Sequence, residues 1–153
     1  MYCKRLIDNY LSEWASRDTH KPVLLRGARQ VGKSTAVKEL SKKFDSFVEI
    51  NFEKQPKYKI LFDDDLDVKR IIPQISAIYG TSIKPGQTLL FLDEIQECPR
   101  AIMALRFFKE DMPELHVIAA GSLLEFALKE LPTFGVGRIH SMLIDDRKYI
   151  PNQ

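Results

Sequence analysis

Runs of apolar residues alternate along the chain with segments in which apolar residues recur every three or four positions. The runs are typical of strands buried on both faces of a parallel sheet, and the recurring spacing is typical of helices with one buried face. The five predicted strands occupy residues 23–26, 47–52, 88–93, 116–121 and 138–144. Because these strands alternate with helices, we expect an α/β fold with a mainly parallel sheet and right-handed crossovers.

The segments between the strands predict the helices. An apolar stripe that ends at Trp14 predicts an N-terminal helix, and we expect Trp14 in the core rather than beside a bound base. A second helix is expected to end at about Lys43. Residues 53–65 are polar and charged, which indicates a surface connection with a short helix around residues 58–62.

Proline residues constrain two further helices. The apolar stripe of residues 68–78 is interrupted by Pro73. This predicts either a kink or a helix that starts near Ile72 with Pro73 in its first turn. Pro99 suits the first turn of the next helix, which we expect to end before Pro113.

The composition is that of an ordinary globular protein, with 153 residues, 44% of them hydrophobic and 29% charged. This length predicts about one domain. We expect a core over residues 1–144, in which residues 1–20 form the N-terminal helix, and a polar tail over residues 145–153. The 23 basic and 21 acidic residues give a formal net charge of +2, which is too small to indicate nucleic acid or an anionic membrane as a partner.

The sequence lacks the signals of a membrane or secreted protein. No apolar run approaches the ~20 residues of a membrane span, and the cations near the N-terminus are followed by Asp8 instead of a long apolar stretch. We therefore predict a cytoplasmic protein with no membrane partner. Cys3 and Cys98 are far apart and suit a reducing compartment, and a cysteine–histidine metal site is not expected.

Residues 27–34 form the first candidate site. They read GARQVGKS, which fits the phosphate-binding pattern G-x-x-x-x-G-K-[ST], and they lie between a predicted strand and a predicted helix. Backbone N–H groups in such a loop turn inward and hold an anion, helped by the positive end of the helix. Gly27 and Gly32 permit the loop conformation. Lys33 supplies a mobile charge for the β- and γ-phosphates, and Ser34 supplies a hydroxyl ligand for Mg²⁺. The residues expected around the nucleotide are Gly27, Ala28, Arg29, Gln30, Val31, Gly32, Lys33, Ser34 and Thr35.

A second candidate site follows the most apolar predicted strand. Asp93 and Glu94 come at the end of this strand, and two acids in that position beyond a phosphate loop form a Walker B element. We expect Asp93 to bind Mg²⁺ together with Ser34. Glu94 would act on the attacking water as a general base or an orienting group. The alternative is that the two acids only end a strand or cap a helix.

Ser122 has two interpretations, which are compatible with each other. It directly follows the fourth predicted strand. In one interpretation its hydroxyl reaches the γ-phosphate or the attacking water. In the other it caps the helix that begins with Leu123.

Four segments of the chain together resemble one family of proteins. The segments are residues 26–34, 89–96, 120–122 and 136–139. They resemble the AAA-fourteen type of prokaryotic P-loop ATPase, which is similar to archaeal-type ATPases and signal-transducing NTPases. The phosphate loop and the two acids are general to P-loop ATPases. The elements that make the resemblance more specific are Arg29-Gln30, Ile95-Gln96 and Gly137-Arg138-Ile139.

The resemblance implies a fold, ligands and roles for residues. The fold would be a three-layer P-loop NTPase whose sheet, by analogy with that class, has the strand order 5-1-4-3-2. The ligands would be ATP and Mg²⁺, with Lys33 on the phosphates, water activation by Glu94 and a sensor role for Ser122. Arg138 either senses or stabilises the γ-phosphate or is a surface arginine at a strand start.

The chain departs from the family pattern in two places. Gly135 stands where relatives commonly have proline, and residues 145–153 do not resemble the helical lid and long C-terminal domain of relatives. We therefore keep two functions open. The first is an ATPase core with slow hydrolysis coupled to conformational change. The second is a nucleotide-binding regulatory or interaction module that does not hydrolyse ATP.

The sequence gives less information about macromolecular partners than about ligands. We expect an unknown protein partner or self-association, and a neighbouring copy could supply Arg100 or Arg106 to complete the site. Nucleic acid is supported only by analogy with the family. A GTPase is disfavoured because no Asn-Lys-x-Asp segment is present, and a small kinase because Glu94 suits water activation better than binding of a phosphate acceptor.

Overall fold

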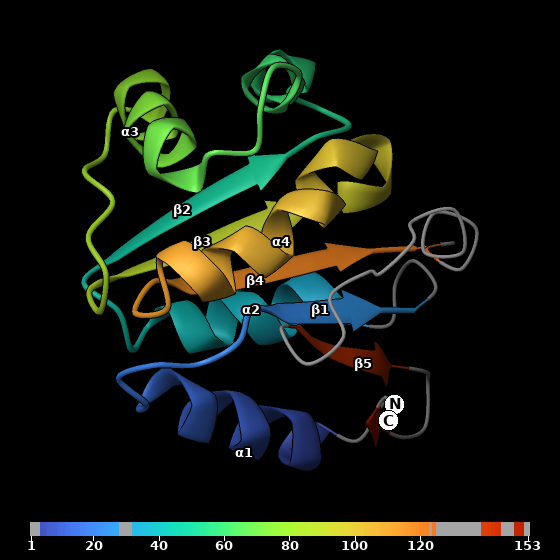
Figure 1. Cartoon of the computed structure of the whole chain (residues 1–153). Helices are drawn as coiled ribbons and strands as arrows, with labels where there is room; N and C mark the ends of the chain where they lie inside the picture. Colours follow the sequence, from blue (N-terminus) through green and yellow to red (C-terminus); the bar gives the residue numbers. More distant parts are fainter. Residues whose placement is uncertain (1–3, 28–31, 123, 125–138, 145–148, 152–153) are drawn as a thin grey trace.

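The computed structural model describes residues 4–27, 32–122, 124, 139–144 and 149–151. In these residues six strands form one sheet in the order β2-β3-β4-β1-β5-β6 (Figure 1). The strands are β1 Val23–Arg26, β2 Ser46–Asn51, β3 Thr88–Asp93, β4 His116–Gly121, β5 His140–Ile144 and β6 Tyr149–Pro151. The helices are α1 Lys4–Ala15, α2 Lys33–Ser41, α3 Val68–Tyr79 and α4 Pro99–Asp111, with two 3₁₀ helices, η1 Pro56–Phe62 and η2 Ile95–Glu97.

The order of the first five strands confirms the predicted order 5-1-4-3-2. β1 lies between β4 and β5, and β3 lies between β2 and β4, with all four pairs parallel. Parallel neighbours require crossover connections, and α2, α3 and α4 lie in those that join the first four strands. The expected α/β fold of the P-loop NTPase class is therefore confirmed.

The sixth strand was not expected. β6 pairs antiparallel with β5 and places Ile150 opposite Leu143. The polar tail predicted over residues 145–153 therefore contains a short strand at the edge of the sheet. A three-residue strand is too short for a pattern of alternation to be visible in the sequence.

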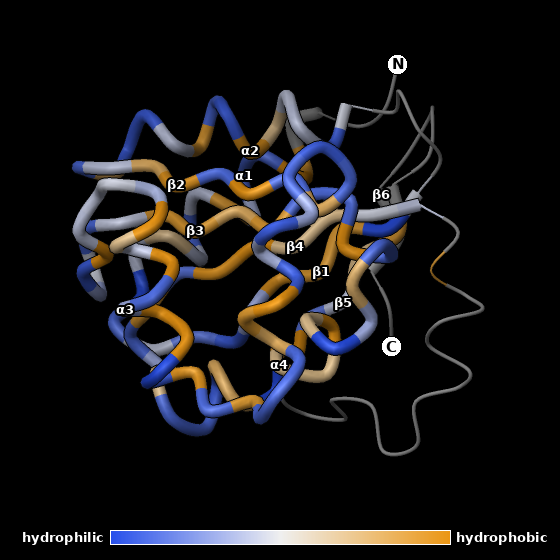
Figure 2. Tube along the Cα trace, turned by 90° about the horizontal axis from the view of Figure 1, so that it is seen from above, coloured by the Kyte–Doolittle hydropathy of each residue, from blue (hydrophilic) through white to orange (hydrophobic). Residues whose placement is uncertain are grey.

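The sheet separates two apolar clusters because successive residues of a strand point to opposite faces. Leu24, Leu90 and Leu92 pack on the side of α3 and α4. Leu25 and Phe91 pack on the side of α1 and α2. Both faces of the central strands are thus buried. Their residues are mostly hydrophobic, as the colouring in Figure 2 shows. Burial of each such side chain stabilises the fold by about 1.5–3 kcal/mol, which explains the unbroken apolar runs in the sequence.

Trp14 lies in the core, as expected. Its side chain is buried in the cluster beneath α1 and α2. The indole Nε1 donates a 2.7 Å hydrogen bond to the carbonyl oxygen of Lys21, which satisfies its polar atom at the edge of the core. The indole therefore fixes α1 and the segment that leads into β1.

Of the two alternatives for the helix around Pro73, a start near Ile72 is wrong, because α3 runs from Val68 to Tyr79 through Pro73. Asp67 caps α3, and its carboxylate accepts a 3.1 Å hydrogen bond from the backbone N–H of Lys69. The helix therefore begins one turn before Ile72, and Pro73 lies inside it with an exposed ring. The capping acid decides the start, since it satisfies a first-turn N–H group that would otherwise lack a partner.

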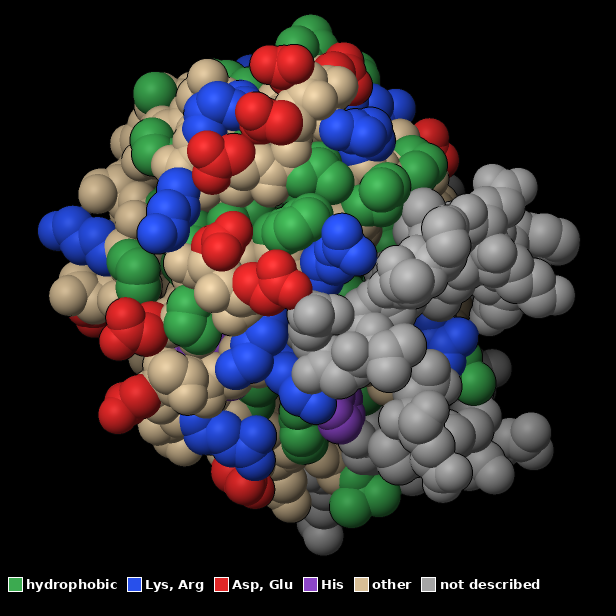
Figure 3. All heavy atoms as spheres, in the orientation of Figure 1, with side chains coloured by type: hydrophobic (Ala, Val, Ile, Leu, Met, Phe, Trp, Pro, Cys, Tyr) green, Lys and Arg blue, Asp and Glu red, His purple; other side chains and the backbone are tan. Residues whose placement is uncertain are grey.

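The surface shows no strong segregation of charge on the described part of the face in Figure 3, where acidic and basic side chains are interspersed. This distribution agrees with the formal net charge of +2. Among the described residues, no helix has the length and apolar character needed to cross a membrane.

Candidate functional site

The carboxyl ends of β1, β3 and β4 meet at one edge of the sheet. Since these strands are parallel neighbours, the segments that follow them open onto the same space, as is usual in α/β folds. A cavity of about 280 Å³ lies at this edge. Its lining residues are Gly32, Lys33, Ser34, Thr35, Asp93, Glu94 and Ser122. The structure thus brings together residues from three segments that the sequence singled out.

The start of α2 forms one wall of this cavity. Gly32 caps the helix with φ of 87°, a left-handed conformation that favours glycine. The Nζ of Lys33 donates a 2.9 Å hydrogen bond to the carbonyl oxygen of Gly27, so the ammonium group returns to the first residue of the loop. The first-turn N–H groups of a helix lack partners within the helix and carry partial positive charge, which suits this wall to phosphate oxygens. The loop residues outside the described part of the chain are Ala28, Arg29, Gln30 and Val31.

Ser34 and Asp93 form the second part of the site. The hydroxyl of Ser34 donates a 3.2 Å hydrogen bond to Oδ2 of Asp93, although the two residues are 59 positions apart. Asp93 is buried at the end of β3, and burial raises the pKa of its carboxyl group. The bond from the backbone N–H of Glu94 to Oδ1, at 2.8 Å, opposes this rise.

These two oxygen-bearing side chains fit a magnesium ion. Mg²⁺ prefers oxygen ligands and is commonly held by one or two carboxylates together with substrate phosphates. A cation beside Asp93 would also offset the cost of burying its carboxylate. Within the described residues, no group of three or more His, Cys, Asp and Glu side chains could hold a metal ion by itself. The site therefore suits a cation that arrives with a phosphate ligand.

Glu94 has an unusual backbone conformation. Its φ is 51°, and among the described residues it alone has a positive φ without being glycine. This left-handed residue leads into η2, and it allows the side chain of Gln96 to turn back toward it. The Nε2 of Gln96 donates a 2.6 Å hydrogen bond to Oε1 of Glu94. The Oε1 of Gln96 in turn accepts a 3.3 Å bond from the backbone N–H of Ser122.

Gln96 is the site residue to which sequence reasoning assigned no role. Its one signal was its place in the Ile95-Gln96 element that made the family resemblance more specific. The hydrogen bonds of its side chain depend on the backbone conformation of Glu94. That conformation cannot be predicted from residue types alone.

The comparisons with known proteins agree with this geometry. Residues 19–145 match the AAA domain family, which is most of the chain. The chain belongs to the AAA domain family. The match covers both the phosphate-binding loop and the two acids, so this AAA domain is a P-loop ATPase core that binds nucleotide.

A solved structure supports the fold of this AAA domain. The structure of PCH-2 from C. elegans is similar to it with a TM-score of 0.52 and 15% sequence identity. The similarity covers 90% of this chain, and the chain spans 41% of the length of the PCH-2 chain. At this identity the likeness concerns the fold alone. Among curated proteins, none matches the chain.

Ser122 and Arg138 are the two other residues of this AAA domain that the sequence predicts near the γ-phosphate. Ser122 is buried and lines the cavity directly after β4. The helix that it was alternatively expected to cap is not among the described elements. Arg138 lies outside the described residues.

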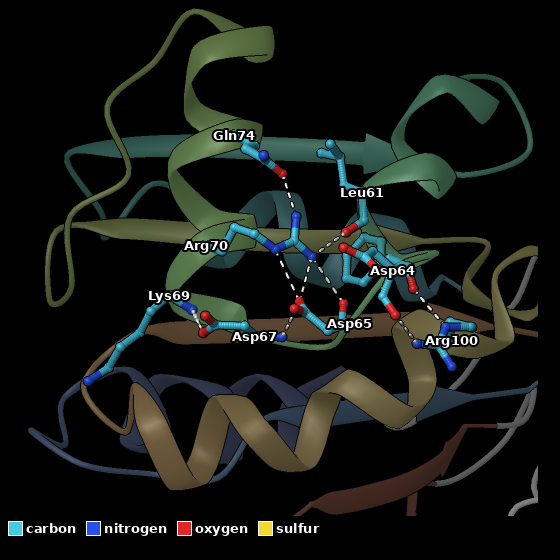
Figure 4. Close-up of polar contacts among 9 residues, drawn as sticks. Leu61, Asp64, Asp65, Asp67, Lys69, Arg70, Gln74 and Arg100 are labelled. Carbon is cyan, nitrogen blue, oxygen red and sulfur yellow. Dashed lines mark hydrogen bonds and ion pairs between the residues drawn. The ribbon is translucent and has the colours of Figure 1, made fainter.

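The two arginines considered as donors to a neighbouring copy are engaged within their own chain. Arg100 donates from Nε to the carbonyl oxygen of Phe62 at 2.7 Å, and from Nη2 to the carbonyl oxygen of Asp64 at 3.3 Å (Figure 4). The guanidinium group of Arg106 lies over the ring of Phe107, 4.6 Å from its centroid. Arg100 therefore holds the connection between η1 and α3, which Arg70 holds from the other side.

Proposed function

We propose that this AAA domain binds ATP together with Mg²⁺, hydrolyses it slowly, and passes the resulting change in conformation to a protein partner or a second copy. The observation that carries the proposal is the 3.2 Å contact between Ser34 and Asp93, directly beside Glu94 and in the same cavity as the start of α2. A phosphate wall, a cation site and a carboxylate that can act on water are the parts that ATP hydrolysis requires.

Binding of the nucleotide would use the start of α2 and Lys33. Residues 33–35 form the first turn of α2, and the N–H groups at the start of a helix favour an anion. On binding, the ammonium group of Lys33 would exchange the carbonyl oxygen of Gly27 for oxygens of the β- and γ-phosphates. The exchange replaces a neutral acceptor by a charged one and therefore strengthens the hydrogen bond.

Ser34 and Asp93 would hold the magnesium ion. When bound, the ion neutralises charge on the phosphate oxygens. The hydroxyl and the carboxylate already lie within hydrogen-bond distance of each other, so one ion can contact both with little rearrangement.

Glu94 would act on the attacking water. The water oxygen forms a bond to the γ-phosphorus while the bond from that phosphorus to the β–γ bridging oxygen breaks, and ADP leaves with the electron pair. The carboxylate orients the water and accepts its proton. Ser122 would contact the γ-phosphate or this water, and Arg138 remains a candidate for a further contact with the γ-phosphate.

A second candidate function is a nucleotide-binding module that does not hydrolyse ATP. The observation that favours it is the 2.6 Å bond from Gln96, which engages one oxygen of the Glu94 carboxylate. In this case ATP would stabilise the fold and control a partner surface without turnover.

Phosphate release and thermal unfolding distinguish the two candidates. We expect the wild-type protein to release phosphate from Mg-ATP about 10²–10⁴-fold faster than the Glu94→Gln variant. At an ATP concentration of about a hundred times the Kd, the melting temperature should rise by roughly 5–10 °C. The Lys33→Ala variant should lose this rise. Glu97→Gln is the matched control, because Glu97 is an exposed acid on the same 3₁₀ helix.

Each result leads to a different conclusion. A thermal shift with phosphate release no faster than in Glu94→Gln rejects hydrolysis and supports the second candidate. If millimolar Mg-ATP leaves the melting temperature unchanged, both candidates are rejected. An effect of Glu97→Gln as large as that of Glu94→Gln would show that general charge loss, and not the cavity carboxylate, is being measured.

A further inference from the structure

We propose that Gln96 is a positioning residue of this ATPase: its side-chain amide fixes the carboxylate of Glu94 and makes the orientation of that carboxylate depend on the end of β4. This inference rests on the proposed function, since it concerns the group that would act on water.

The amide of Gln96 bridges the ends of two neighbouring strands. Its Nε2 donates to Oε1 of Glu94 at 2.6 Å, just after β3, and its Oε1 accepts from the backbone N–H of Ser122 at 3.3 Å, just after β4. Both Glu94 and Ser122 line the cavity, whereas Gln96 is not among the lining residues. Gln96 therefore acts on the site through other residues.

The backbone around Glu94 is arranged so that this bridge can form. With φ of 51°, Glu94 has a conformation that side-chain-bearing residues rarely adopt. Its N–H donates to Asp93, and its carbonyl oxygen accepts a 3.1 Å bond from the N–H of Glu97, which closes the turn of η2. Such strained conformations persist where surrounding contacts over-determine them, and they occur preferentially at functional sites. Here the strain brings the side chain at position 96 back to the one at position 94.

The end of β4 leaves room for the amide. A Cβ atom built on Gly121 would lie 2.5 Å from Oε1 of Gln96 and 3.3 Å from the methyl groups of Leu124. A side chain at position 121 would therefore displace the amide, and the flexible end of Gln96 would be the group that moves. The glycine and the glutamine thus form one unit, although they are 25 positions apart in the sequence.

The chemistry of the bridge requires an amide. The carboxylate of Glu94 needs a donor, and the N–H of Ser122 needs an acceptor. Among side chains of this length, glutamine offers both without having to take up a proton. A hydrogen bond to a charged acceptor is also stronger than one between neutral groups, so the donor from Gln96 restricts the carboxylate. A shift of Ser122 on phosphate binding would be passed through the amide to Glu94.

Three substitutions separate the two halves of the bridge. Gln96→Met keeps the length of the side chain and removes both hydrogen bonds. Gln96→Glu keeps an acceptor for the N–H of Ser122 but, when ionised, has no donor for Glu94. Gly121→Ala leaves Gln96 in place in the sequence and displaces its amide. Gln87→Met is the matched control, because Gln87 lies in an exposed turn away from the cavity.

We expect Gln96→Met and Gly121→Ala each to lower kcat about ten- to a hundredfold, since small misplacements of a reacting group have effects of this size. The Kd for Mg-ATP, measured with the same proteins, should stay within about twofold of wild type, because Gln96 does not line the cavity. The double variant should lose no more than either single variant, since both changes remove the same contact.

The split between kcat and Kd gives a readout that a merely structural role would not produce. Gln96→Glu should lower kcat as Gln96→Met does, because an ionised carboxylate at position 96 accepts from Ser122 but has no hydrogen to donate to Glu94. Its melting temperature should stay close to that of wild type, since the contact with Ser122 is kept.

The outcomes separate this inference from the proposed function. If wild type is faster than Glu94→Gln while Gln96→Met and Gly121→Ala match wild type, Gln96 is not a positioning residue and the ATPase proposal stands. If kcat and melting temperature of Gln96→Met fall and its Kd for Mg-ATP rises, the role is structural and the inference is wrong. If wild type is no faster than Glu94→Gln, both fail. Should Gln96→Met not fold, Gly121→Ala and Gln96→Glu decide the same question.

Discussion

The two ends of the central strands bury polar side chains in opposite ways. At the amino end of β4, the ring of His116 stacks on that of His20 with centroids 3.6 Å apart. Trp14 packs edge-on against His116, 4.7 Å away. Neither ring nitrogen of His20 has a hydrogen-bond partner among the described residues. These imidazoles act as flat apolar groups.

At the carboxyl end, four polar side chains of the site are linked in a chain of hydrogen bonds. Asp93 accepts from Ser34 and from the N–H of Glu94, Glu94 accepts from Gln96, and Gln96 accepts from Ser122. The unusual backbone conformations of the site, at Gly32 and Glu94, also lie at this end.

The difference shows what burial does to the charge of each group. Burial lowers the pKa of His20 from 6.5 to about 3, and burial raises the pKa of Asp93. In both cases it disfavours the charged form. His20 can remain neutral at neutral pH without loss of stability. Asp93 instead accepts hydrogen bonds from two donors, and it lies where a cation and phosphates can approach. We therefore expect the amino end to determine stability and the carboxyl end to determine chemistry.

Asp93→Asn should produce the largest effect and should separate the two ends most clearly. The amide can still accept from the N–H of Glu94 and can donate to the hydroxyl of Ser34, so the fold should be retained. Loss of the carboxylate should lower phosphate release by at least about a hundredfold, since electrostatic groups at the reacting phosphate have effects of this size. The measurement is steady-state phosphate release with Mg-ATP.

The stability of Asp93→Asn should change in the opposite direction. Because the folded state raises the pKa of this acid, its ionised form costs stability at neutral pH, and the cost is removed as the pH falls through the folded pKa. The neutral amide removes that cost at every pH, so the melting temperature without ligand should rise. Asp111→Asn, at the exposed end of α4, is the control. A lower melting temperature in Asp93→Asn would contradict the view that burial disfavours this charge.

His20→Phe should have the next largest effect, on stability alone. The pKa of His20 is lower in the folded state, so the unfolded chain binds the proton first, and stability is lost as the pH falls below about 6.5 toward 3. At 1.36 kcal/mol per pH unit, wild type should lose about 2 kcal/mol between pH 6.5 and 5 through this residue. Phenylalanine keeps a ring stacked on His116 and does not titrate, so the variant should lack this loss.

Urea unfolding at about pH 5, 6 and 7.5 measures this difference directly, and it stays above the range in which most carboxylates titrate. The affinity of His20→Phe for ATP at neutral pH should equal that of wild type, because His20 precedes β1 and does not line the cavity. Parallel pH dependence in the two proteins would show that the imidazole is accessible to protons, and the contrast between the two ends would fail.

The sequence predicts the carboxyl end better than the amino end for a physical reason. Asp93 and Glu94 follow an unbroken apolar run, so their place at the end of a buried strand is evident, and parallel pairing brings that end to the phosphate loop. The pairing of His20 with His116 depends on the packing of α1 and leaves no local pattern. The hydrogen bond from Gln96 to Glu94 depends on the left-handed backbone conformation of Glu94. Glycine or asparagine at that position would have indicated such a conformation, but glutamate does not. The sequence therefore predicts the positions of strands and helices, but it does not predict which side chains from different elements contact each other.

Arg100→Met should have the smallest effect on stability and activity. It tests whether Arg100 belongs to the site at the carboxyl end. Arg100 binds the carbonyl oxygens of Phe62 and Asp64, and methionine keeps the length of the side chain without the donors. We expect a loss of about 1 kcal/mol in stability, which is a fall of about 2–4 °C in melting temperature for a chain of this size. Phosphate release per folded molecule should not change, because both bonds serve the connection to α3.

Arg70→Met is the matched control for this last prediction. Arg70 binds the same connection through Leu61 and Asp65 and does not line the cavity, so its loss should affect stability alone. Phosphate release should be measured over a range of protein concentrations for both variants. If the rate per molecule of wild type and Arg70→Met rises with protein concentration while that of Arg100→Met does not, a second copy supplies Arg100 to the site. The guanidinium group would then have to leave Phe62 and Asp64 on association, and the site would extend beyond one chain.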